Sequence, residues 1–163
     1  MSIEQDIARV SLQEQTLQFE HFDARTAWDI GSRLKAAAEW KNAAVAIDIT
    51  VNGHPLFFYT MPGTSPDNAD WIRRKRNTVQ RWHRSSLGFG LKLEKDQIDL
   101  FKRFGVDFND YAVHGGSFPL VVAGTGCIGS ITVSGLPHRE DHGIIVEVLA
   151  NFLGKPLAGL ALE

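Results

Sequence analysis

The sequence of 163 residues contains one cysteine, Cys127, so it cannot form an intramolecular disulfide. It also lacks any apolar run close to the roughly 20 residues needed to span a bilayer, and its polar N-terminus, MSIEQDIARV, does not resemble a signal peptide. The formal net charge of -2 gives no global attraction to nucleic acid or anionic membranes. These absences predict a cytoplasmic protein with no membrane-associated segment.

The sequence also contains neither a phosphate-binding loop nor a nucleophile elbow, two common catalytic motifs. The hydrophobic content of 44% and the charged content of 22% are ordinary for a globular protein of one domain. We therefore expect a single domain over residues 1–154 and a C-terminal tail over residues 155–163 that frays. Cys127 is interpreted as a small buried hydrophobe in a strand rather than as a nucleophile.

Hydrophobic periodicity predicts a mixture of helices and antiparallel strands. Helical spacing and capping residues predict an N-terminal helix after Ser2, then helices over about 24–40, 66–84 and 95–104, and a last one that includes residues 144–152. Alternating apolar residues predict strands over 45–51, 56–61, 87–93, 117–122 and 127–134. Tight turns at 52–53 and 123–126 imply antiparallel pairing. The predicted fold class is α+β, with an antiparallel sheet of about five strands flanked by helices.

The third of these helices concentrates positive charge. Its basic residues are Arg73, Arg74, Lys75, Arg76, Arg81 and Arg84. Trp71 and Trp82 fall on a different face, which we expect to pack on the core. Arginines on an ordered helix can bind carboxylates or phosphates, so one interpretation is an anion-binding wall. The alternative, given equal weight, is a solvated helix with surface ion pairs. One basic stripe on an acidic chain disfavours nucleic-acid binding.

Two histidines lie beside residues that suit a ligand site. His83 ends the basic helix next to Arg84 and Ser85, where it can act as an acid, a base or an axial ligand, or simply cap the helix. His114 precedes Gly115 and Gly116, whose missing side chains let backbone amides approach a ligand. A glycine pair is more often just a turn or bulge.

A metal site is a weaker hypothesis from the last helix. His138 and His142 are four residues apart with Asp141 between them, which can present two nitrogens and a carboxylate to a divalent metal. The same residues are also what an exposed first helical turn would contain. Because the sequence fixes no further ligand, this motif is not diagnostic.

The order of several motifs resembles a known family. The stretches are TSPDNADWIRRKRNTVQRWHRSS and HGGSFPLVVAGTGCIGSITVSGLPHREDH, supported by the segment AIDITVNGHPLFFYTMPG. Together they resemble uncharacterised protein family 0303 (UPF0303), within the GlcG/HbpS-like heme-degrading-domain superfamily. The resemblance implies a profilin-like sheet with flanking helices, assembly into homo-oligomers and heme as a cofactor.

These observations support three functional hypotheses. In the first, the protein binds a small anionic ligand or heme, with or without degrading it, through Arg73, Arg76, Asn77, Arg81, His83, Arg84, Ser85, His114, Gly115 and Gly116. In the second, it is a non-catalytic oligomeric module that presents the basic helix to an acidic protein partner. In the third, it is a metal-dependent enzyme that uses His138, Asp141 and His142.

Overall fold

The computed structural model describes residues 2–162. Within this range the helices are α1 (Ile3–Thr16), α2 (Ala24–Trp40), α3 (Pro66–Trp82), α4 (Ser86–Lys95), α5 (Leu100–Phe104) and α6 (His138–Phe152). The strands are β1 (Ala46–Val51), β2 (His54–Thr60), β3 (Ser117–Val122) and β4 (Gly126–Ser134). The α+β class expected from the sequence is confirmed, with four strands instead of about five.

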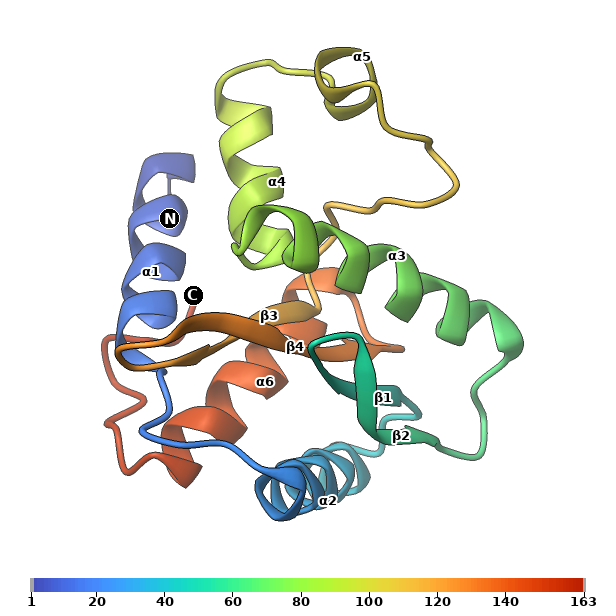
Figure 1. Cartoon of the computed structure of the whole chain (residues 1–163), viewed down its shortest axis with the longest axis vertical. Coiled ribbons are helices and arrows are strands. Elements are labelled where there is room, and N and C mark those ends of the chain that lie inside the picture. The colour runs from blue at the N-terminus through green and yellow to red at the C-terminus, as the bar shows by residue number, and fades with distance from the viewer. Residues whose placement is uncertain (1, 163) are drawn as a thin grey trace.

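The four strands form one antiparallel sheet in the order β2-β1-β4-β3. Asn52 and Gly53 join β1 to β2 with φ values of 50° and 77°, the left-handed conformation that such a hairpin turn requires. Figure 1 shows the sheet in the middle of the molecule, with α3 and α4 on one side and α2 and α6 on the other.

The two faces of the sheet differ in chemistry. Alternation places apolar side chains on the face covered by α2 and α6, where they form the main core; these include Ile47, Ile49, Phe118, Leu120, Ile131 and Val133. The face toward α3 and α4 is buried but polar, and it carries Asp48, Thr50, Ser117, Ser130, Thr132 and Ser134. Helix α3 therefore packs on a polar layer, which explains why its buried residues include Lys75 and Thr78.

Residues 87–93 form part of helix α4, so the strand predicted there is wrong. Ser85 caps the helix by accepting a hydrogen bond from the Gly88 backbone nitrogen at 3.0 Å. Leu87 and Leu91, four residues apart, pack on Val10 of α1. Tertiary packing and this cap outweigh the local alternation of apolar residues, which is equally compatible with a short helix.

The other differences concern α5 and the C-terminus. The helix expected over residues 95–104 is limited to α5, where Asp99 provides the N-cap and Gly105, with φ 64°, ends the helix. The tail expected to fray is instead packed against the domain: Leu160 is buried, and its carbonyl oxygen accepts a 2.6 Å hydrogen bond from Gln13 of α1. Leu160 of the expected tail therefore contacts the domain, whereas residues 154–159 are exposed.

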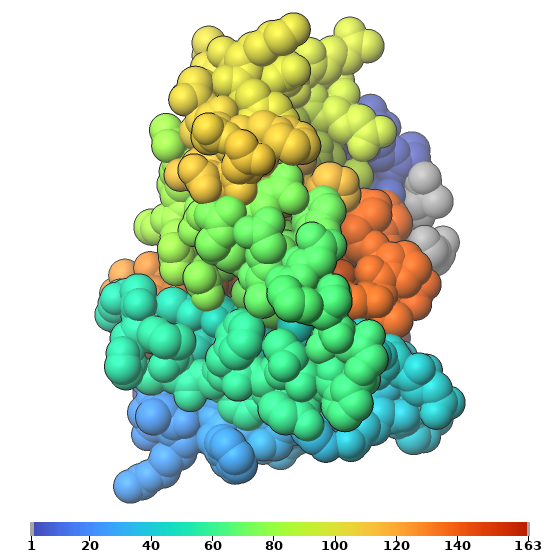
Figure 2. All heavy atoms as spheres, turned by 90° about the vertical axis from the view of Figure 1, so that its right-hand side faces the viewer, coloured from blue at the N-terminus to red at the C-terminus, as the bar shows by residue number. Residues whose placement is uncertain are grey.

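The surface view shows which segments lie on either side of α3. In Figure 2 the green surface of α3 lies between the yellow surface of the α4–α5 region and the teal surface around the β1–β2 hairpin.

Among the helices that the structure describes, none is both long and apolar enough to cross a membrane.

Candidate functional site

The arginines of α3 are largely engaged by the protein's own carboxylates. Arg73 Nη1 lies 2.8 Å from Asp110 Oδ1. Hydrogen bonds to Asp110 and Asp70 are the main cause that raises the pKa of the Arg73 guanidinium. Asn77 donates to the Asp110 backbone oxygen at 2.9 Å. The outer side of the helix thus holds the loop that contains Asp110.

Two further arginines pair with partly or fully buried acids. Arg76 Nη1 lies 3.0 Å from Oδ2 of Asp48, and Arg84 Nε lies 2.7 Å from Oε2 of Glu14. Burial raises the pKa of Asp48, although the nearby Arg76 charge opposes this shift. Arg81 lies over the rings of Trp82 and Tyr111. These contacts correspond to the second interpretation of the sequence, a helix whose arginines form ion pairs, rather than to an anion-binding wall.

His83 lies at the far end of α3 from His114. His83 adopts a left-handed conformation with φ 53° as the C-cap of α3, whereas His114 packs against Trp71 with ring centroids 5.0 Å apart. Twelve residues separate Trp71 from His83, which corresponds to about 18 Å along an α-helix. The structure does not bring His83 and His114 into one site.

The surroundings of His83 form a separate, small hollow. A cavity of about 240 Å³ lies beside the turn between β1 and β2, and its lining includes Gln80, His83 and Cys127. Cys127 lies in β4, as expected, but it is only half-buried; this burial raises the pKa of the thiol. Ser85, predicted as a ligand residue, caps α4 and donates its backbone N–H to Glu14 at 2.8 Å.

His114 and His138 form a pair that connects the loop before β3 to the start of α6. Their ring centroids are 5.9 Å apart with an interplanar angle of 83°. The Gly115 backbone N–H donates to His138 Nδ1 at 3.2 Å. Burial is the main cause that lowers the pKa of both histidines, and nearby positive charges, including that of Lys75, lower it further. Both rings are therefore neutral at pH 7.

These two histidines lie at the edge of an apolar cavity of about 430 Å³, which we call the histidine pocket. Its apolar lining comes from α4, α5 and the segments beside them: Leu87, Gly90, Leu91, Leu93, Ile98, Leu100, Phe101 and Val113. Glu94 and Asp99 also line it, and Asp99 is engaged as the α5 cap. The volume falls within the range of about 300–1,000 Å³ that is usual for small-molecule sites.

A buried ion pair supports the loop that carries His114. Lys75 Nζ lies 3.0 Å from Asp141 Oδ2 and donates to the Val133 backbone oxygen at 3.1 Å. Burial lowers the pKa of Lys75 and raises that of Asp141, while their mutual attraction opposes both shifts. A Cβ at Gly116, where φ is 124°, would lie 2.5 Å from Lys75 Nζ. Gly116 is therefore required for this packing and not just for a turn.

Each of the three residues that the sequence suggested as metal ligands contacts a different partner. His138 accepts from Gly115, Asp141 pairs with Lys75, and His142 Nε2 lies 2.7 Å from Gln13 Oε1. Over residues 2–162, no three histidine, cysteine or acidic side chains gather into a metal-binding group. The structure thus offers no support for a metal centre built on this motif.

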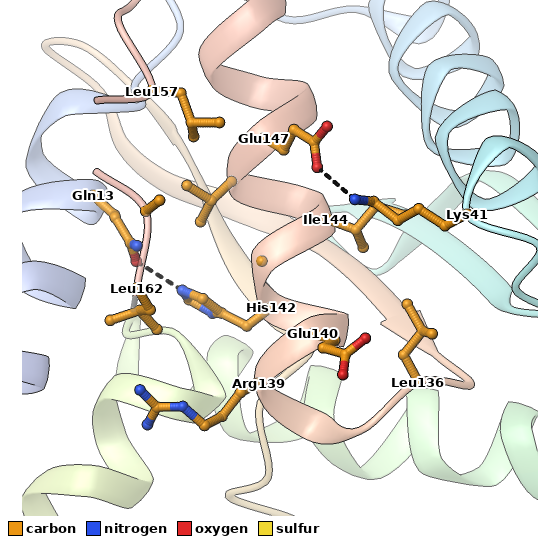
Figure 3. Close-up of a pocket in the computed structure, with 13 residues that line it drawn as sticks. Gln13, Lys41, Leu136, Arg139, Glu140, His142, Ile144, Glu147, Leu157 and Leu162 are labelled. Carbon is orange, nitrogen blue, oxygen red and sulfur yellow. Dashed lines mark hydrogen bonds and ion pairs between the residues drawn. The ribbon is translucent and has the colours of Figure 1, made fainter. Parts of the chain in front are cut away.

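His142 belongs to a second cavity of about 360 Å³ between α6, α1 and the C-terminal segment. Figure 3 shows its ring directed from α6 toward Gln13 on α1. Complete burial lowers the pKa of His142 to about 3. This histidine is therefore a neutral part of the interior that connects α6 through Gln13 to the C-terminal segment.

Sequence reasoning recognised His114 and His138 separately but missed that they meet. His138 was considered only as a metal ligand, and the histidine pocket was missed because five of its twelve lining residues come from α4, which the alternation of apolar residues had predicted as a strand. The serines before Leu87 were the available signal, because Ser85 is a favourable N-cap.

Comparisons with known proteins agree with this architecture. A "UPF0303 protein" of Azotobacter vinelandii is 53% identical over 163 residues, which cover 100% of this chain and 98% of the relative. A crystal structure named Ybr137w protein is 32% identical, with a TM-score of 0.83, and the match covers 91% of this chain and 87% of that one.

A more distant solved structure is titled a PduOC:Heme complex. It has a TM-score of 0.69 at 15% identity, and the match covers 79% of this chain and 93% of that one, so it shows similarity of fold alone. The family model described as "Haem degrading protein HbpS-like" matches residues 22–150. The chain therefore belongs to the HbpS-like family, and its near relatives carry the UPF0303 name.

Proposed function

We propose that the protein binds heme in the histidine pocket. The observation that carries this proposal is the pair of neutral imidazoles, His114 and His138, at the edge of an apolar cavity of about 430 Å³. A neutral imidazole is a common protein ligand of heme iron, and apolar walls suit the porphyrin ring. The HbpS-like family description and the heme named for a protein of the same fold support this choice of ligand.

The residues present fit the chemical parts of heme. Leu91 and Phe101 belong to the apolar lining that would contact a porphyrin, and a histidine at the edge would supply a nitrogen to the iron. The basic residues Lys102 and Arg103 follow the lining residue Phe101 on α5 and are exposed, but they are not part of the pocket lining. When bound, heme would supply a redox-active iron; the protein's own residues bind it, orient it and exclude water from the apolar side.

The test compares the histidine pocket with the hollow beside His83. Tag-free protein is titrated with heme and followed by the Soret band, together with the variants Ile98→Trp, which fills the histidine pocket, and Gln80→Trp, which fills the hollow beside His83. We expect saturable one-to-one binding by the unsubstituted protein and by Gln80→Trp, and loss of binding by Ile98→Trp. Weak, non-saturable binding by the unsubstituted protein would overturn heme binding, and unchanged binding by Ile98→Trp would overturn the location.

A second candidate function is an interaction module, with self-association as its simplest form. Trp28 is 69% exposed, Trp40 is 82% exposed and Phe58 on the edge strand β2 is 52% exposed. Large exposed aromatic side chains are enriched at protein interfaces. We expect an oligomer by sedimentation velocity that Phe58→Lys weakens, whereas Leu12→Lys on α1 serves as the control. A monomer at all concentrations would contradict self-association.

A further inference from the structure

We infer that His114 is the iron ligand of the histidine pocket and that His138 is a positioning residue that does not bind the iron. This assignment rests on the proposed heme binding and distinguishes between two histidines that line the same cavity. It follows from the hydrogen bonds of the two rings, which leave a free nitrogen lone pair on one of them.

The Nδ1 lone pair of His138 is already used. Nδ1 accepts the hydrogen bond from the Gly115 backbone N–H at 3.2 Å. A neutral imidazole has one N–H and one acceptor nitrogen, so Nε2 of His138 carries the proton. A nitrogen that carries a proton has no lone pair to give to iron. His138 can therefore present a hydrogen-bond donor to a ligand, but not a metal-binding nitrogen.

Close packing holds this arrangement in place. Gly115 is buried, and a Cβ on it would lie 2.3 Å from the His138 backbone oxygen, so its backbone is in direct contact with the start of α6. Breaking the hydrogen bond would leave a buried backbone N–H without a partner, which is unfavourable. Freeing Nδ1 of His138 for iron is correspondingly unfavourable.

His114 has the opposite properties. Within residues 2–162, its ring makes edge-to-face contacts with Trp71 and His138, and neither of its nitrogens has a hydrogen-bond partner. The residue is exposed and lines the histidine pocket. A neutral ring with an unengaged acceptor nitrogen can give the lone pair of that nitrogen to iron.

The experiment compares heme-loaded variants by absorption and electron paramagnetic resonance spectra. His114→Gly removes the proposed ligand, and added imidazole can occupy the space that the side chain leaves. His138→Asn removes the imidazole but keeps a side-chain oxygen able to accept from the Gly115 N–H, whereas His138→Ala removes that acceptor as well. Circular dichroism of each variant establishes that it is folded.

We expect His114→Gly to lose the spectrum of histidine-ligated heme and to regain it with imidazole. His138→Asn should keep that spectrum, and His138→Ala should keep it while lowering the melting temperature, because the buried Gly115 N–H then lacks an acceptor. Loss of the histidine-ligated spectrum in folded His138→Asn, or its retention in His114→Gly without imidazole, would overturn the assignment. Failure of the unsubstituted protein to bind heme would instead overturn the proposed function.

Discussion

The buried His142 predicts a specific loss of stability in acid. Its ring is fully buried and bonded to Gln13, and this burial lowers its pKa from 6.5 to about 3. In the unfolded chain the same ring takes up a proton as the pH falls through about 6.5, whereas the folded state resists protonation until about pH 3. The unfolded state therefore binds more protons over this interval, and the free energy of unfolding decreases as the pH falls.

The size of the effect follows from the two pKa values. Between about pH 8 and about pH 5, His142 should remove about 2 kcal/mol from the free energy of unfolding, and by about pH 3 the loss is about 4 kcal/mol. Asp48 and Asp141 act in the opposite direction, because burial raises their pKa values and favours the protonated folded form. Their contribution must be separated from that of His142.

The assay is urea denaturation across this pH range for the unsubstituted protein and for His142→Gln, which keeps a side-chain N–H able to donate to Gln13. Both proteins contain the same buried carboxyl groups, so the difference between their pH profiles isolates His142. A matched control, His54→Gln, removes an exposed histidine. Parallel pH profiles for the unsubstituted protein and His142→Gln would refute the reasoning.

Four further substitutions test the packing around the histidine pocket and α6. Gly116→Ala should lower the melting temperature strongly, because its Cβ would lie 2.5 Å from Lys75 Nζ at a φ of 124°. Gly143→Ala should raise stability by about 0.5–1 kcal/mol, because the glycine is within α6 and a Cβ there meets no atom within 4 Å. Lys75→Met alone should cost about 3–5 kcal/mol in chemical denaturation by leaving Asp141 buried and unpaired, and adding Asp141→Leu should recover part of the loss.

Much of the fold could be predicted because its signals are local. The capping box at Ser2, the Asn52-Gly53 turn and the apolar spacing of the last helix each specify an element that the structure contains. The strand predicted at 87–93 was wrong because Leu87 and Leu91 suit both periods over such a short run. Contact with Val10, which lies far away in the sequence, determines the outcome.

The candidate site could be predicted only in part, because it depends on contacts between distant segments. The basic character of α3 was visible, but its acidic partners were not: Asp48 comes from β1 and Asp110 from the loop before β3. His114 and His138 are 24 positions apart and meet only when β3 and β4 pair beside α3. No local pattern connects residues at that separation.

The measurement that tests the central claim most directly is a Soret-band titration of heme into three forms of the tag-free protein: unsubstituted, His114→Ala and His83→Asn. Asparagine tolerates the left-handed conformation of position 83, where φ is 53°, so this control should fold. The account predicts one-to-one binding with a histidine-ligated spectrum in the unsubstituted protein and in His83→Asn, and loss of that spectrum in His114→Ala. An unchanged spectrum in His114→Ala together with its loss in His83→Asn would contradict the histidine pocket and move the site to the other end of α3.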